Sequence, residues 1–143
     1  MISIYIDGCC IGNEYKNFNK TGSAAIIVFN EYGRLIYKDG INIENNPYIT
    51  SNIMEYFGLM LALDFIERGD FINDEITIFS DSQLMVNQIN GEYACDSNNL
   101  LPFYIEAMKF LEGMENIQLR WIPREKNTLA DSLANELVNN KKF

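Results

Sequence analysis

The sequence predicts an α/β fold in which a five-stranded mixed sheet is covered by helices on both faces. Two observations support this prediction. The first 43 residues contain three β-rich runs with short connections, a pattern typical of an antiparallel meander. The rest of the chain alternates between helical and strand-like periods, which is typical of a mixed sheet with helices on it. The expected order is βββαβααβα, and no linker divides residues 1–143, so we expect a single domain.

The first half of the chain supplies the meander and one long helix. Isoleucines alternate in the first run, the second run is apolar, and a turn signal at residues 30–33 precedes the third. A helix with apolar residues over much of its surface follows the cap-rich residues 50–52. The expected bounds are 2–10, 24–29 and 35–43 for the strands and 52–68 for the helix.

The second half of the chain alternates between short strands and helices. Gly91 and Gly113 are suited to end helices, Pro123 ends the last strand, and Asn127 is expected to cap the final helix. In that helix leucines recur every four residues, at positions 129, 133 and 137. The expected bounds are 76–79 and 117–122 for the strands, and 82–90, 100–112 and 127 onward for the helices. In such sheets, functional groups gather at the carboxyl ends of parallel strands.

Composition excludes several classes of protein. The three cysteines have no C-x-x-C spacing, so neither a zinc site nor a disulfide framework is indicated, and we expect reduced thiols in a cytoplasmic protein. No apolar run is long enough for a membrane span, and the first residues lack a secretory signal. The formal net charge of −9 with eleven Lys and Arg is unusual for a protein that tracks phosphates, unless carboxylates gather around divalent metal ions.

Four acids stand at the junctions of the expected elements. Asp7 interrupts an apolar strand, where an ionised carboxylate is costly unless it meets a cation. Glu55 lies in the first turn of a helix, Asp81 follows a buried strand, and Asp131 lies one turn inside the last helix. Each also has a structural explanation: a strand-end acid for Asp7, a capping box for Glu55, an N-cap for Asp81 and an exposed first-turn acid for Asp131.

The sequence around these acids resembles a known family. The segments 5–13, 50–55, 80–83 and 123–134 are similar to the four signature blocks of type 1 ribonuclease H, and they occur in that family's order. The elements between them match the family's fold over nearly the whole chain. The resemblance implies a ribonuclease H-like fold and endonucleolytic hydrolysis of the RNA strand of RNA–DNA hybrids, leaving 5′-phosphate and 3′-hydroxyl ends.

The resemblance also implies a metal site and a set of substrate contacts. Asp7, Glu55, Asp81 and Asp131 would be catalytic residues that hold two Mg²⁺ ions, with Mn²⁺ as a substitute, because hard cations prefer oxygen ligands. Reading of the 2′-hydroxyl and of the DNA strand's phosphate would fall to short polar residues and backbone. The matching positions are Gly8, Cys10, Ser51, Asn52 and Gln83 for the 2′-hydroxyl, and Asn13 and Thr50 for the phosphate.

Four features depart from the family's common pattern. The loop at 13–21 contains no glycine, and Ile53 stands where some members carry an Arg. Residues 91–100 leave no room for a basic protrusion, and the chain has no His to act before the last acid, where Arg124, Glu125 and Lys126 stand instead. We therefore expect weak binding of substrate. The protein is expected to act as a monomer on the hybrid, with no membrane and no obligate protein partner.

Two other functions remain open from the sequence. One is an inactive nucleic-acid-binding module on the same fold, which the acidic charge favours, because fold does not guarantee activity. Retention of four mutually repelling acids argues against it. The other is a related nuclease, such as a 3′–5′ exonuclease or a junction resolvase, to which the contexts of Asp81 and Asp131 are less similar.

Overall fold

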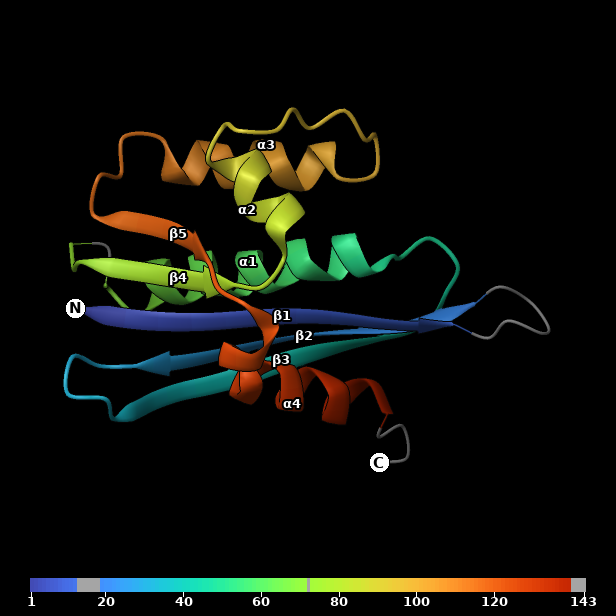
Figure 1. Cartoon of the computed structure of the whole chain (residues 1–143), viewed down its shortest axis with the longest axis horizontal. Coiled ribbons are helices and arrows are strands. Elements are labelled where there is room, and N and C mark those ends of the chain that lie inside the picture. Colours follow the sequence, from blue (N-terminus) through green and yellow to red (C-terminus); the bar gives the residue numbers. More distant parts are fainter. Residues whose placement is uncertain (13–18, 72, 140–143) are drawn as a thin grey trace.

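The computed structural model describes residues 1–12, 19–71 and 73–139. Its centre is a five-stranded sheet in the order β3-β2-β1-β4-β5 (Figure 1). The middle strand β1 (Ile2–Gly12) pairs antiparallel with β2 (Lys20–Phe29) and parallel with β4 (Ile76–Ser80). Strands β3 (Leu35–Asn46) and β5 (Ile117–Trp121) form the two edges. The mixed sheet and the antiparallel meander predicted from the sequence are therefore confirmed.

Helices cover both faces of the sheet, as predicted. Helices α1 (Ser51–Arg68), α2 (Gln83–Ile89) and α3 (Leu101–Leu111) lie on one side of the sheet, and α4 (Thr128–Asn139) lies on the other (Figure 1). A 3₁₀ turn, η1 (Arg124–Lys126), leads from β5 into α4. The polar run before α1 acts as expected, because the Thr50 hydroxyl accepts a hydrogen bond from the Ile53 N–H at 3.1 Å.

The main core lies between the sheet and α1. Ile4 and Ile6 of β1 are fully buried and belong to the same apolar cluster as Leu59 and Ile66 of α1. Each such aliphatic side chain contributes about 1.5–3 kcal/mol when it leaves water. Successive side chains of a strand point to opposite faces, so Ile4 and Ile6 direct Asp7 to the face that α4 covers. The core thus fixes the direction of the first acid.

The leucines that recur every four residues do not form the centre of the contact between α4 and the sheet. Ala130, Ala134 and Val138 are buried, whereas Leu129 is 58% exposed. The helix lies so close to the sheet that the Ser23 hydroxyl of β2 donates a hydrogen bond to the Ala134 carbonyl. Small side chains permit that approach, so the large leucines lie at the margins of the contact.

Four strands extend beyond the bounds expected from the sequence. Strand β1 continues to Gly12 rather than residue 10, and β4 continues to Ser80 rather than 79. Strand β2 begins at Lys20 rather than residue 24, and β3 continues to Asn46 rather than 43. Gly91 and Gly113 adopt φ values of 87° and 77° after α2 and α3, as expected of helix-ending glycines. Within the described ranges, no helix combines the length and hydropathy that a membrane span requires.

Candidate metal centre

Asp7 lies on the central strand and is buried. Asp7 is only 4% exposed, and it pairs with Ala25 of β2 in the middle of the sheet. Burial raises the pKa of the Asp7 carboxyl from 3.8 to about 8, with the charge of Asp81 as the second cause and Asp131 as the third. A carboxyl held in this way favours either a proton or a cation beside it.

Gly8 brings α1 against the central strand. A Cβ atom at this position would lie 2.3 Å from the Met54 carbonyl carbon and 2.4 Å from the Glu55 backbone nitrogen. Only glycine allows this approach. The Gly8 N–H donates a hydrogen bond to Glu55 Oε1 at 2.9 Å, which aims the Glu55 carboxylate at the strand. Burial and the charges of Asp7 and Asp81 raise the pKa of Glu55 well above its ordinary value.

The structural explanation of Glu55 as a capping-box residue is wrong. The N-cap of α1 is Thr50, three residues before Ile53, and the Glu55 carboxylate accepts its hydrogen bond from Gly8 on another element. The helix end is therefore satisfied without Glu55. Its carboxylate is available for the cluster on the sheet.

Asp81 follows β4 directly and is not the N-cap of α2. That role belongs to Ser82, whose hydroxyl accepts from the Met85 N–H at 3.2 Å. The Asp81 carboxylate instead accepts from the Asn127 amide, with 3.3 Å between Oδ2 and Nδ2. Burial raises the pKa of Asp81, while the Asn127 hydrogen bond and Arg124 lower it and Asp131 raises it. The indole N–H of Trp121 donates to the Asp81 carbonyl at 3.2 Å.

Three of the four acids form a tight cluster. Carboxylate oxygens of Asp7, Glu55 and Asp81 all lie within 4.8 Å of one another. They come from a strand, a helix and a strand-to-helix junction that are far apart in the sequence, so only the fold brings them together. Burial, and after it the charges of neighbouring acids, raises the pKa of all three carboxyls, so their charged forms are poorly stabilised by the protein alone. An all-oxygen donor set of this kind fits a hard divalent cation.

Asp131 lies at the edge of this cluster. It is one turn into α4, partly buried, and its charge and hydrogen bonding both raise the pKa of Asp7. Its Oδ1 is 3.5 Å from Nη2 of Arg124 on the 3₁₀ turn. The fourth predicted acid therefore adjoins the other three but does not belong to the group within 4.8 Å. Arg124 places a positive charge beside the cluster.

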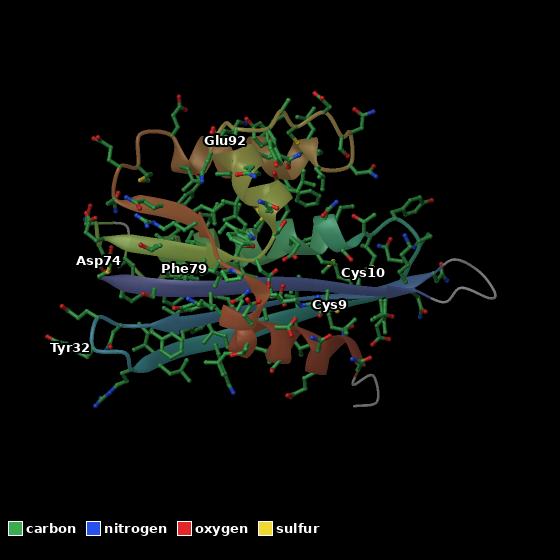
Figure 2. The ribbon with its side chains drawn as sticks, in the orientation of Figure 1. Cys9, Cys10, Tyr32, Asp74, Phe79 and Glu92 are labelled. Atoms are coloured by element: carbon green, nitrogen blue, oxygen red, sulfur yellow. The ribbon has the colours of Figure 1, made fainter. Side chains whose placement is uncertain are left out.

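The residues expected to contact substrate differ in how far their side chains are exposed to solvent. Ser51 and Asn52 are exposed at the start of α1, and Gln83 is exposed as the first residue of α2. Cys10 lies two residues after Gly8 on β1 (Figure 2). It is half-buried and packs on the small apolar cluster of Ala24, Ile49 and Met54. Thr50 uses its hydroxyl as the helix cap. Asn13 lies outside the described residues.

Sequence reasoning missed two side chains near the site. Asn127 was expected to cap α4 with its side chain, but its amide donates to the Ile6 carbonyl at 2.8 Å and to Asp81. Only its backbone carbonyl serves α4, by accepting from the Asp131 N–H. Lys20 Nζ donates to the Ile49 carbonyl just before α1. Nothing in the local pattern indicated either contact, because both join segments far apart in the sequence.

The fold is that of the ribonuclease H-like class. The structure superposes on RNase H1 of the halophilic archaeon Halobacterium salinarum with a TM-score of 0.79, at 26% identity and over 97% of this chain and 98% of that one. It superposes on LC11-RNase H1 in complex with an RNA/DNA hybrid with a TM-score of 0.81, at 28% identity and over 98% of both chains. Within this class, residues 8–137 match the reverse transcriptase-like family, and the chain belongs to that family.

Curated relatives agree with this assignment. Ribonuclease HI of Halobacterium salinarum is 29% identical over 140 residues, which are 96% of this chain and 64% of that protein. A bifunctional protein of Mycobacterium tuberculosis is 34% identical over 91 residues, 63% of this chain. That match spans only 24% of the mycobacterial protein's length.

Proposed function

We propose that this protein is a ribonuclease H that hydrolyses the RNA strand of RNA–DNA hybrids internally, leaving 5′-phosphate and 3′-hydroxyl ends. The observation that carries the proposal is the convergence of Asp7, Glu55 and Asp81 within 4.8 Å, with Asp131 beside them, on a ribonuclease H-like fold. The likeness to an RNase H1 whose structure contains an RNA/DNA hybrid supports the choice of substrate.

The four acids are proposed as the ligands of two Mg²⁺ ions, with Mn²⁺ as a substitute. When bound, such ions activate water and stabilise the departing oxygen of a phosphodiester. The protein's own contribution is to hold the carboxylates in place before the metal arrives. Gly8 directs Glu55, and Asn127 directs Asp81, while burial keeps Asp7 poorly solvated. Burial, and after it the repulsion between neighbouring acids, raises the pKa values of Asp7 and Glu55, and a bound cation would offset both effects.

Recognition of the hybrid is proposed for the surface around α1 and α2. The exposed Ser51 and Asn52 at the start of α1 and Gln83 at the start of α2 supply polar groups for the 2′-hydroxyl, together with Gly8 and Cys10. Asn13 and Thr50 are proposed contacts to a phosphate of the DNA strand. Ile53 is buried in the core and offers no cation to that phosphate.

The organisation of the protein is part of the proposal. Residues 1–143 are proposed to form one catalytic domain that acts as a monomer. The three free, half-buried cysteines suit a reducing compartment, and we place the protein in the cytoplasm on that basis.

Replacement of one acid tests the proposed function. The variant Asp81→Asn should lose at least about 100-fold of the hybrid-cleaving activity in Mg²⁺, because removal of a ligand costs more than the loss of an outer-shell group. Its fold should persist, since Asp81 does not cap α2. The matched control is Asp74→Asn, an exposed acid at the far end of the molecule, which should cleave at the parent's rate (Figure 2). An Asp81→Asn variant as active as this control would refute the catalytic assignment.

A further inference from the structure

Asn127 connects three of the elements that carry the acids. Its side-chain nitrogen donates to the Ile6 carbonyl of β1 at 2.8 Å, directly before Asp7. The same nitrogen donates to Asp81 Oδ2 after β4 at 3.3 Å. Its backbone carbonyl accepts from the Asp131 N–H at 3.0 Å, in the first turn of α4. One residue therefore fixes the strand before Asp7, the carboxylate of Asp81 and the helix turn that carries Asp131.

The hydrogen bonds of Asn127 fix which way its amide points. Two oxygen acceptors face the nitrogen, so exchange of the amide's nitrogen and oxygen would place oxygen against oxygen. In the observed orientation both N–H groups are used. The residue is 1% exposed, and Oδ1 is buried with no hydrogen-bond partner among the described residues. An unpaired buried acceptor opposes folding. The orientation of the amide therefore satisfies the Ile6 carbonyl and the Asp81 carboxylate, while Oδ1 of Asn127 is left without a partner in the described part of the chain.

We propose that Asn127 is a positioning residue for the metal centre, which holds the Asp81 carboxylate in one orientation before metal binds. The inference rests on the proposed metal site but adds a residue that does not itself ligate. Asp81 sits at the end of a strand with no other side-chain donor to its carboxylate among the described hydrogen bonds. Without the Asn127 amide this carboxylate is free to rotate, and metal binding must then order it. Partners of this outer-shell kind typically contribute about 10- to 100-fold to metal affinity.

The test compares two asparagines with similar contacts. Asn127→Ala and Asn127→Ser remove the amide beside Asp81. The control Asn90→Ala removes an amide that also donates to a strand carbonyl, that of Leu119 at 3.0 Å, but touches none of the acids. Mn²⁺ affinity is measured by calorimetry on the full chain without nucleic acid, and thermal unfolding is followed without metal. If Ala at position 127 prevents folding, the Ser variant decides the outcome.

We expect both Asn127 variants to bind Mn²⁺ at least about 10-fold more weakly than the parent, while Asn90→Ala binds it within about twofold. In hybrid cleavage, the Mg²⁺ concentration at half-maximal rate should rise by a similar factor, with a smaller fall of kcat at saturating Mg²⁺. If Asn127 had a purely structural role, the Asn127 variants and Asn90→Ala would all have lower melting temperatures, but their Mn²⁺ affinities would equal that of the parent. That result would overturn the inference. A parent that binds no Mn²⁺ would instead overturn the proposed metal site itself.

Discussion

Neutralising Asp7 should stabilise the metal-free protein by an amount that grows as the pH rises from about 4 to about 8. The unfolded chain releases the Asp7 proton near 3.8, whereas the folded chain retains it until about 8, because the carboxyl is buried beside Asp81 and Asp131. Between these values the unfolded state binds fewer protons, so the stability of the folded state falls as pH rises. The amide of the variant Asp7→Asn carries no charge at any pH. The stability of the variant therefore does not fall with pH through residue 7.

The size of the effect follows from the pKa difference. Each pKa unit corresponds to about 1.4 kcal/mol, so an isolated carboxyl with this shift would destabilise the protein by up to about 6 kcal/mol at pH 8. Asp7 titrates together with Glu55 and Asp81, whose pKa values are also raised, so part of the cost remains with them after the substitution. We therefore expect a net gain of about 2–3 kcal/mol at pH 8, or roughly 6–10 °C in Tm for a chain of this size.

Urea unfolding in a chelator at several pH values measures this gain. The difference in unfolding free energy between Asp7→Asn and the parent should be near zero at pH 4 and should grow up to pH 8. Added Mg²⁺ should then stabilise the parent and not the variant, because only the parent offers the full ligand set. A gain of equal size at pH 4 and pH 8, or a variant less stable than the parent at pH 8, would show that the Asp7 charge is not strained in the folded protein.

Three further outcomes are expected. The variant Gly8→Ala should be about 3 kcal/mol less stable than the parent, because the added Cβ would lie 2.3 Å from the α1 backbone. In the control Gly12→Ala the nearest contact of the added Cβ is at 3.7 Å, so its unfolding free energy should equal that of the parent. The single Trp121 donates to the Asp81 carbonyl, so Mg²⁺ should change its fluorescence emission, and the response should vanish in Asp81→Asn. With eleven basic residues, an inactive Glu55→Gln variant should bind hybrid with a shallow slope of about −2 to −3 in log affinity against log salt; a slope beyond about −5 would reveal a basic patch.

The sequence was most informative where the periodicity of apolar residues matches the residues that are buried in the core. The alternating isoleucines of β1 lie on one face of the strand, which left Asp7 on the other, and the long apolar helix carries Glu55 to the same strand. The strand followed by a polar junction placed Asp81 at the sheet's carboxyl edge. These features depend on short stretches of sequence, so the fold class could be predicted from them. The four acids were singled out by the resemblance of the segments around them to the signature blocks of type 1 ribonuclease H.

Features that depend on contacts between distant segments could not be predicted. Leucines that recur every four residues normally mark a buried stripe, yet the close approach of α4 to Ser23 favours alanines at the contact. Asn127 stands where an N-cap is expected, and only the fold shows that its amide reaches Ile6 and Asp81 instead. Capping was likewise an adequate local explanation of Glu55 until Gly8 was seen to be its partner.

The central claim is tested most directly by one cleavage assay on internally and terminally labelled substrates. The panel contains an RNA–DNA hybrid, duplex RNA, single-stranded RNA, duplex DNA, and duplex DNA with a short run of ribonucleotides, each with Mg²⁺ and with Mn²⁺. The account predicts internal cuts in the RNA strand of the hybrid and within the ribonucleotide run, with 5′-phosphate ends and with no activity in chelator. Equal cutting of duplex DNA, a ladder that begins strictly at a terminus, or cleavage that persists without divalent metal would contradict it.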